Sequence, residues 1–376
     1  MKIIFCISNM STSTSNLQPW LTIYNVAQYL SNNGFDIHII TDVKNPENIK
    51  NINIHIVKSL LSNNSKEIIN IVDSIDPEYI VVSVTPFSLL FNTWYDKLNG
   101  IKKIAFFSYS LYTKKEILKS LKFINLKNRF EFGRELIIPT HFSLSILSKK
   151  FDFAVCQSNR TYNRVKRHLK DFIIYKIDPG IVLEDWEYEN KTFSDQTLFL
   201  YTGSPKKIRG FYTLLKAFSL ISQENVRLKI LARGTEPEAL HCIEKYIRQK
   251  KLGHKVSLVG GWIDRATLNK ELLHADLLTL PFVLVPAELP VTLMESIASG
   301  TPVLVTDIDG LPDAVGRAGL VAPHADIAGL SKVMLHFHQN VAEKKRLHDA
   351  CHHQRSNMKS WNDIGKLWEQ ALKRHV

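Results

Sequence analysis

The sequence has few cysteines, no long apolar run and no low-complexity segment. Its four cysteines, Cys6, Cys156, Cys242 and Cys351, lie far apart, and none belongs to a Cys-x-x-Cys pair. This spacing excludes a disulfide scaffold and favours free thiols in a reducing compartment. No stretch approaches the roughly 18 apolar residues of a membrane span, and the first apolar run is too short for a secretory signal. We therefore expect a cytoplasmic protein.

Acidic residues are also in deficit. The 36 acidic residues are outnumbered by 48 lysines and arginines, which gives a formal net charge of +12. This charge favours anionic partners, namely nucleic acid, an anionic membrane surface or phosphorylated small molecules, without choosing among them. The hydrophobic share of 45% over 376 residues is ordinary for a globular chain of two or three domains. Composition thus excludes a disordered or collagen-like protein.

Short apolar runs alternate with amphipathic stretches along the whole chain. In the first half we expect a helix at 21–32 and strands at 2–8, 35–41, 51–57, 79–85, 102–110 and 151–158. In the second half we expect strands at 198–204, 226–233, 255–261, 275–282 and 301–307, with helices at 212–222, 237–250, 264–274 and 290–299. This β-α-β rhythm predicts an α/β protein with two Rossmann-like, doubly wound domains, at 1–190 and 191–355. Their facing strand ends would form the ligand cleft.

A basic turn containing glycines lies at the start of the second series. Residues 203–210 read GSPKKIRG and join an expected strand to an expected helix. Glycine lets a ligand approach the backbone, a helix N-terminus favours an anion, and the Lys and Arg side chains add positive charge. The turn lacks the Gly-Lys-Ser/Thr ending of a Walker A loop. A phosphate-binding turn and an exposed basic loop remain equal alternatives on the pattern alone.

Two glutamates flank the start of a later amphipathic helix. Pro290 suits the first helical turn, Glu295 lies inside the helix, and Gly300 follows its end. Glu288 and Glu295 carry carboxylates that can hold sugar hydroxyls, while backbone N–H groups at 291–293 are available to a phosphate. The pattern alone favours the simpler interpretation, in which both glutamates are solvated.

Three motifs together resemble a known family. GSPKKIRG, ELPVTLMESIASGTPV and GLPDAV resemble the nucleotide-sugar domain of GT-B glycosyltransferases, specifically the retaining family 4, or group 1. The resemblance covers residues 198 to the end, whereas the first half is similar in rhythm, in FDFAVCQSNRTYNRV and in the turn near Gly180. It implies an acceptor-binding first domain, a donor-binding second domain, and a final helix within 356–376 that crosses back to the first domain. The donor would be a nucleotide-diphospho-sugar, and no cofactor is implied.

The resemblance also implies roles for individual residues. The donor diphosphate would contact the basic turn and a second glycine turn, represented by Gly203, Ser204, Lys207, Arg209, Arg233 and Gly234. The first helical turn after the glutamate loop would contribute Pro290, Val291, Thr292 and Leu293. Glu295 would bind the ribose, Trp262 and Ile263 the base, and Glu288 the donor sugar. Catalysis would rest on Glu288, Arg209 and Lys207.

Some positions depart from the family pattern. Six residues separate Glu288 from Glu295 instead of seven, so Ala287 occupies the family position, and Ser204 stands where many members carry an arginine. The usual acceptor-domain histidine is absent at Ser108 and Tyr109. We predict that the acceptor site includes Ser11, Ser108, Tyr109 and His141.

Segment 113–139 is both basic and apolar. It is expected either to pack as an ordinary helix with a solvated lysine face or to lie on an anionic membrane surface. Lipid-linked acceptors, which are common in the family, favour the membrane. The protein would then be peripheral on the cytoplasmic face.

An aspartate pair and a histidine pair have the spacing of candidate metal ligands. Asp307-x-Asp309 resembles a motif of the GT-A fold, but it follows a strand where a turn is expected, and aspartate favours turns. His348 and His352 are four residues apart, but no third ligand is evident, which favours a solvated helix face. We predict no essential metal.

The predicted function is retaining transfer of a sugar to a hydroxyl acceptor, in the synthesis of cell-surface glycans or glycolipids. The alternatives are a nucleotide-sugar epimerase, a catalytically lapsed GT-B scaffold and a basic nucleic-acid-binding protein. Nucleic acid is not favoured as a partner, because the sequence has no RNP-like strand, zinc finger or Gly-x-x-Gly helix loop.

Overall fold

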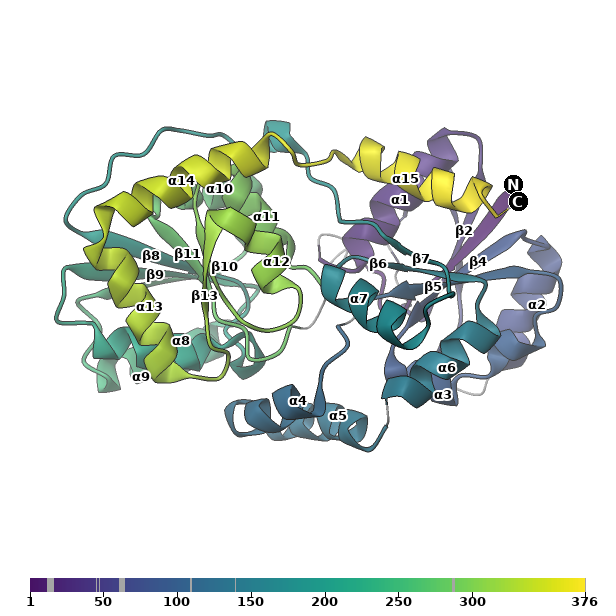
Figure 1. Ribbon diagram of the computed structural model, residues 1–376, viewed down its shortest axis with the longest axis horizontal. Coiled ribbons are helices and arrows are strands. Elements are labelled where there is room, and N and C mark those ends of the chain that lie inside the picture. The colour runs from purple at the N-terminus through teal and green to yellow at the C-terminus, as the bar shows by residue number, and fades with distance from the viewer. Residues whose placement is uncertain are drawn as a thin grey trace.

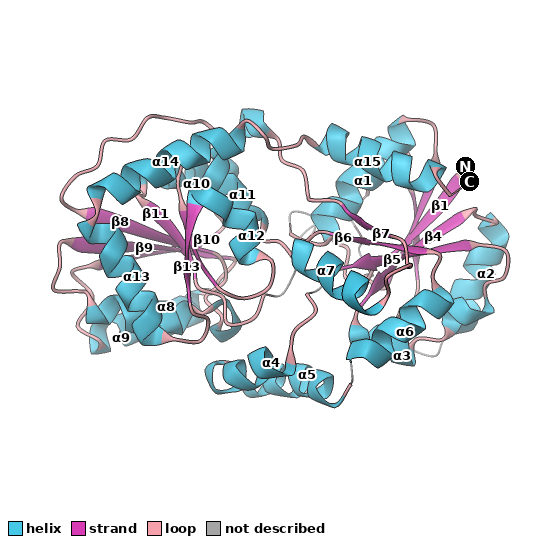
Figure 2. Cartoon of the chain, viewed as in Figure 1, coloured by secondary structure: helices cyan, strands magenta, loops and turns pink. Residues whose placement is uncertain are grey.

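Two parallel sheets, each covered by helices on both faces, form the molecule (Figure 1). The structure is a computed structural model that describes residues 1–11, 17–44, 46, 48–60, 65–108, 110–138, 140–285 and 288–375. Strands and helices alternate along both halves (Figure 2). The predicted α/β class with two doubly wound sheets is therefore confirmed.

The first sheet has seven parallel strands in the order β3-β2-β1-β4-β5-β6-β7. The strands are β1 (Lys2–Cys6), β2 (Asp36–Thr41), β3 (Asn53–Ile56), β4 (Tyr79–Val84), β5 (Lys102–Phe107), β6 (Phe153–Cys156) and β7 (Ile174–Lys176). The helices are α1 (Trp20–Asn32), α2 (Ser65–Ile75), α3 (Pro86–Phe91), α4 (Lys114–Ser120), α5 (Leu126–Ile137), α6 (Thr140–Lys150) and α7 (Asn159–His168), with short 3-10 turns η1 (Trp94–Lys97), η2 (Leu121–Phe123) and η3 (Leu183–Asp185). The central strands are continuously apolar because helices bury them on both faces.

The second sheet has six parallel strands in the order β10-β9-β8-β11-β12-β13. The strands are β8 (Thr197–Thr202), β9 (Val226–Arg233), β10 (Val256–Gly261), β11 (Leu277–Leu280), β12 (Val303–Thr306) and β13 (Gly319–Ala322). The helices are α8 (Phe211–Leu220), α9 (Pro237–Gln249), α10 (Arg265–His274), α11 (Val291–Ala298), α12 (Leu311–Val315), α13 (Ile327–Gln339) and α14 (Val341–Arg355), with 3-10 turns η4 (Lys207–Arg209) and η5 (Gly316–Ala318). The sequence missed β7 and β13, which are edge strands of three and four residues.

The last helix, α15 (Trp361–Lys373), lies beside α1 on the first domain (Figure 1). Trp368 is buried there, with its ring centroid 6.3 Å from Phe5 and 5.8 Å from Phe106. The Tyr79 hydroxyl donates to the Leu372 carbonyl at 3.0 Å. The chain therefore crosses between the domains twice.

Segment 113–139 forms α4, η2 and α5, apart from the undescribed Pro139. Ile117, Ile124 and Phe132 are buried in the same apolar core as residues of the second domain. Phe130 and Ile137 are 74% and 81% exposed. The segment thus packs against the second domain and also presents an apolar surface to solvent.

His348 does not lie on a solvated helix face, so that expectation is wrong. It is buried, its Nδ1 donates to the Gly300 carbonyl at 2.7 Å, and its Nε2 lies 3.1 Å from the Tyr188 hydroxyl. A carbonyl only accepts, so Nδ1 carries the proton and Nε2 accepts from Tyr188. The residue anchors the interdomain connection to the second domain.

All four cysteines are free thiols, three of them buried and Cys242 exposed. Within the described ranges, no helix is both long enough and apolar enough to traverse a bilayer.

Candidate functional site

The basic turn predicted from the sequence follows the carboxyl end of β8, next to the end of β9. Gly203 follows β8 with a φ of +131°, a conformation that favours glycine. A Cβ atom at this position would lie 2.6 Å from Nη1 of Arg209. Gly203 therefore leaves the space that the Arg209 guanidinium occupies above the strand end.

Gly210 fixes the far end of the same turn. Its φ is +74°, and a Cβ atom there would approach the Pro281 carbonyl oxygen to 1.7 Å. Only glycine fits this contact between the start of α8 and the end of β11. The turn that presents Arg209 is thus held against the sheet.

Arg209 and Arg233 form no ion pair with a described residue. Arg209 lies over the Phe282 ring, 5.7 Å from its centroid, and burial together with the nearby Arg233 lowers the pKa of its guanidinium. Neither arginine forms a hydrogen bond or ion pair with any residue that the structure describes. Two guanidiniums at the strand ends that form no ion pair favour an anionic ligand with several acceptor oxygens.

Glu295 lies on α11, near both Arg233 and Arg265. Burial raises the pKa of its carboxyl to about 7, although the two arginines act in the opposite direction. Its Oε2 atom is buried and has no hydrogen-bond partner in the described part of the chain. A buried carboxylate oxygen without a donor is costly, and a hydroxyl group of a ligand would satisfy it.

The start of α11 offers fewer free amides than the sequence suggested. Pro290 is the N-cap residue and provides no side-chain cap. The Leu293 N–H donates to the Pro290 carbonyl at 3.2 Å, whereas those of Val291 and Thr292 have no partner among described residues. Two amides of the three are thus available to an anion.

The predicted base-binding residues differ in exposure. Trp262 follows β10 and is 81% exposed, whereas the Ile263 side chain is buried in the core. The Gly234 N–H donates to the Gly261 carbonyl at 3.1 Å, which joins the turns after β9 and β10. Trp262 is therefore free to stack on a planar ring, and only the backbone of Ile263 is accessible to a base.

Lys207 and Ser204 of the basic turn differ in how they are held. Lys207 is exposed on η4, while Ser204 accepts a hydrogen bond from the Tyr201 hydroxyl through its carbonyl oxygen at 2.8 Å. Ser204 therefore stabilises the turn through its backbone. Lys207 has the flexibility to reach a ligand but is not held in place.

Glu288 lies across the interface between the domains. Its carboxylate accepts from the Gln157 N–H at 2.5 Å and from the Ser158 hydroxyl at 3.0 Å, at the start of α7. The residue is fully buried, and burial together with nearby Asp309 raises the pKa of its carboxyl to about 8. Ala287, at the family position of this glutamate, lies outside the described residues.

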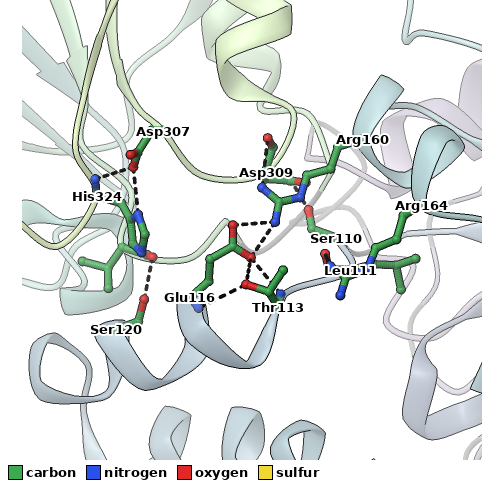
Figure 3. A network of polar contacts seen from close by, with 11 residues as sticks. Ser110, Leu111, Thr113, Glu116, Ser120, Arg160, Arg164, Asp307, Asp309 and His324 are labelled. Carbon is green, nitrogen blue, oxygen red and sulfur yellow. Dashed lines mark hydrogen bonds and ion pairs between the residues drawn. The ribbon is translucent and has the colours of Figure 1, made fainter. Parts of the chain in front are cut away.

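Asp309 is a second carboxyl at this interface (Figure 3). It accepts a hydrogen bond from the Ser110 hydroxyl of the first domain, and burial raises the pKa of its carboxyl to about 7. Its φ is +58°, so it sits in a turn, as predicted, in a conformation that aspartate tolerates. No pattern in the sequence indicates its contact with Ser110.

Asp307 and Asp309 point to different partners (Figure 3). The Asp307 carboxylate lies 2.8 Å from Nδ1 of His324 and also accepts the His324 N–H at 2.6 Å. Asp309 faces Ser110 instead. In the part of the chain that the structure describes, no three His, Cys, Asp or Glu side chains are grouped to hold a metal ion.

An ion pair completes the interface on the first domain. Arg160 of α7 pairs with Glu116 of α4 at 2.5 Å and donates to the Asp309 carbonyl at 3.5 Å. Thr113 and Glu116 form a capping box that starts α4 and orients this carboxylate. The motif Thr-x-x-Glu is visible in the sequence, but it predicts a helix start and not the distant arginine.

The predicted acceptor residues are not brought together by hydrogen bonds between described residues. Ser108 is buried, with its hydroxyl 2.6 Å from that of Ser83. His141 is exposed at the start of α6, and Ser11 forms an isolated bridge with Pro46. Tyr109 lies outside the described residues.

The second domain resembles a known family in sequence. The family model described as "Glycosyl transferases group 1" matches residues 196–340. An uncharacterized glycosyltransferase of Methanocaldococcus jannaschii is 28% identical over 122 residues, which are 32% of this chain and 30% of that protein. The alignment thus spans less than a third of that relative's length.

Solved structures resemble the whole chain. Sucrose-phosphate synthase from Thermosynechococcus elongatus has a TM-score of 0.76 at 15% identity, covering 100% of this chain and 98% of the other. Anabaena HepE in complex with UDP-glucose has a TM-score of 0.71 at 11% identity, covering 100% of both chains. The chain has the GT-B fold, as predicted. Within it, residues 196–340 are the part that resembles the group 1 glycosyltransferases in sequence.

Proposed function

We propose that this protein is a retaining glycosyltransferase that moves a sugar from a nucleotide-diphospho-sugar to a hydroxyl acceptor. The observation that carries the proposal is the pair of guanidiniums of Arg209 and Arg233, which lack an anion at the strand ends of a glycosyltransferase domain. A donor diphosphate supplies that anion. A uridine nucleotide is the donor we propose, because a structure of the same fold holds UDP-glucose.

The proposed chemistry rests on the stabilisation of developing negative charge. As the bond between the sugar and the diphosphate breaks, Arg209, Lys207 and the free amides at the start of α11 stabilise the departing group. Glu295 accepts hydrogen bonds from the ribose, and Trp262 stacks on the base. The acceptor hydroxyl attacks the same face of the sugar, so no protein nucleophile is needed.

Product analysis tests this proposal. Purified protein is incubated with UDP-sugars and an acceptor preparation, and the anomeric configuration of the product is read by NMR. We expect UDP release coupled to a product that keeps the donor's configuration. An inverted product would contradict retention, and conversion of the donor sugar without UDP release would indicate an epimerase instead.

We further propose that transfer needs no metal ion. Asp307 is bound to His324 and Asp309 to Ser110, so the two carboxylates do not converge. Activity should persist in excess chelator. Complete loss that manganese restores would overturn this part of the proposal.

A membrane-bound acceptor is the substrate class we propose, in the synthesis of cell-surface glycans or glycolipids at the cytoplasmic face. The exposed apolar side chains of α5 support it, since Leu126, Phe130 and Ile137 are 80%, 74% and 81% exposed. The same segment carries lysines and arginines at positions 114, 115, 119, 122, 127, 129 and 134. Apolar side chains among cations suit an anionic bilayer surface.

Vesicle flotation tests this surface. Phe130→Ser should weaken binding to vesicles with anionic lipids by roughly tenfold, since it removes one aromatic side chain that the bilayer would bury. The matched control is Leu220→Ser, because Leu220 of α8 is 63% exposed on the other domain. Equal binding of both variants, or no binding of the wild type to anionic vesicles, would overturn the membrane proposal.

A further inference from the structure

Two carboxyl groups of the second domain are buried against the first domain. Glu288 accepts from the Gln157 N–H and the Ser158 hydroxyl, and Asp309 accepts from the Ser110 hydroxyl. Their exposed fractions are 0% and 6%. These contacts exist only while the domains lie against each other, because every donor belongs to the first domain.

Neither carboxyl forms an ion pair of its own among described residues, and burial outweighs the hydrogen bonds at Glu288 and the Arg160 charge near Asp309 that favour the ionised forms. The Arg160 guanidinium already pairs with Glu116, and Arg164 donates to the Leu111 carbonyl at 2.8 Å (Figure 3). Oδ1 of Asp309 is buried and has no hydrogen-bond partner among described residues. Among the described residues, the thiol of Cys156 and the phenol of Tyr112 also lie near the two carboxyls, and burial keeps them neutral because it raises the pKa of both.

We propose that Glu288 and Asp309 form a proton-dependent latch, which holds the two domains together while these carboxyls are protonated and releases them when they ionise. An ionised carboxylate is costly in a buried interface, the more so for Asp309 because one of its oxygens has no partner among described residues, and it is solvated when the domains separate. A protonated carboxyl avoids that cost. The latch thus acts through desolvation.

The direction of the pH effect follows from burial. In the closed arrangement the pKa is raised to about 8 for Glu288 and about 7 for Asp309, against ordinary values of 4.5 and 3.8 in an exposed state. Closing therefore takes up protons between roughly pH 4 and 8. The closed population falls as the pH rises through this window, by about tenfold in the equilibrium constant per pH unit for each proton.

The latch affects the proposed function through Glu288. The family resemblance implies that Glu288 contacts the donor sugar, whereas in the structure its carboxylate is held by Gln157 and Ser158 of the first domain. Ionisation would then release Glu288 towards the donor and open the cleft in the same step. The inference rests on the proposed function only in this consequence, since closure itself is measured without substrate.

Small-angle X-ray scattering of the full chain across pH 5.5–8.5 tests the latch. We expect the radius of gyration of the wild type to increase with pH. The double variant Glu288→Gln, Asp309→Asn should keep the smaller radius at every pH, because neither amide ionises. A constant radius for the wild type, or a double variant that expands like the wild type, would overturn the proposal.

The matched control is Glu116→Gln. Glu116 lies in the same network but pairs within the first domain, and its pKa is lowered, so it stays ionised across the window. This variant should keep the pH-dependent expansion of the wild type, and its loss would contradict the assignment to Glu288 and Asp309. If the double variant does not fold, Asp309→Asn alone serves, because asparagine tolerates the left-handed backbone; the wild-type increase should then be reduced, and an unreduced increase counts against the latch.

UDP binding is measured on the same samples. A failed latch with intact UDP binding refutes only the latch. Absent UDP binding with a pH-dependent radius refutes the proposed function and leaves the latch standing.

Discussion

The strand ends of the second domain and the start of α7 in the first domain both carry arginines, and these arginines differ in what surrounds them. Arg209 and Arg233 of the second domain have no hydrogen bond or ion pair with described residues. Arg160 of the first domain pairs with Glu116 at 2.5 Å and reaches the Asp309 carbonyl. The first group has the electrostatics of a ligand site that lacks its anion, and the second has those of a satisfied structural contact.

The presence or absence of an ion pair indicates which arginines need an anionic ligand. A partly buried guanidinium without an ion pair is unfavourable unless a ligand supplies the missing negative charge. Arg160 already has its carboxylate. We therefore place the donor at Arg209 and Arg233, and treat Arg160 as a residue that positions α7 against the second domain.

The largest expected effect comes from removing the guanidinium at the strand end. Arg209→Ala should lower turnover by roughly one to three orders of magnitude, since it deletes an oriented cation beside the leaving diphosphate. Lys207→Ala is the matched control, because Lys207 is exposed on the same turn, and its loss should be smaller. Steady-state rates with a UDP-sugar measure both. Near-normal turnover in Arg209→Ala would remove the distinction between the two arginine groups.

A second test concerns the carboxylate beside Arg233. Glu295→Gln should weaken UDP binding by roughly tenfold to a hundredfold above pH 8, because a charged acceptor for ribose hydroxyls is lost. The pKa of Glu295 is raised to about 7, so its charged form is lost as the pH falls through that value. The ratio of wild-type to variant affinity, measured by calorimetry from pH 6 to 8.5, should shrink towards acid. A ratio independent of pH would contradict the assignment.

A third test concerns the exposed ring after β10. Trp262→Ala should weaken nucleotide binding by about tenfold, in line with the stacking of a base on an aromatic ring. The midpoint of thermal unfolding without ligand should hardly change, because the side chain is 81% exposed. Calorimetry and thermal unfolding separate the two effects. Unchanged affinity would show that the base lies elsewhere.

The smallest effect on binding is expected at the ion pair between Arg160 and Glu116. Glu116→Gln should leave UDP affinity unchanged and lower the free energy of unfolding by roughly 1–2 kcal/mol, between the values of an exposed and a buried pair. Burial raises the pKa of the Glu116 carboxyl, but pairing with Arg160 outweighs burial and lowers the pKa below its ordinary 4.5. The stabilisation by the pair is therefore present above pH 4.5 and is lost in more acidic solution. Urea unfolding at pH 7 and pH 3.5 measures it. A large loss of UDP affinity would place a ligand anion at Arg160 as well.

Local sequence patterns predicted the donor side of the molecule well. The turn around Gly203 and Gly210 and the helix with Glu295 are defined by residues close together in the chain. Glycine spacing and amphipathic periodicity therefore indicated their structure before any tertiary contact was known. Their roles towards the donor stay predictions that the variants above test.

The interface could not be predicted in the same way. Glu288 meets Gln157 and Ser158 about 130 positions earlier in the chain, and Asp309 meets Ser110 across an even longer separation. No local pattern encodes such contacts, because they depend on how two finished domains dock. The short edge strands β7 and β13 were missed for a simpler reason, since three or four residues carry little periodicity.

Thermal unfolding with UDP, GDP, ADP and their sugar conjugates, without added metal, tests the central claim most directly. A ligand that binds only the folded state raises the unfolding midpoint. We predict that the uridine compounds raise the midpoint of the wild type and of Glu116→Gln, and that Arg209→Ala loses most of this increase. No increase with any nucleotide in well-folded protein, or an equal increase in Arg209→Ala, would contradict the assignment of the donor site to the unpaired arginines.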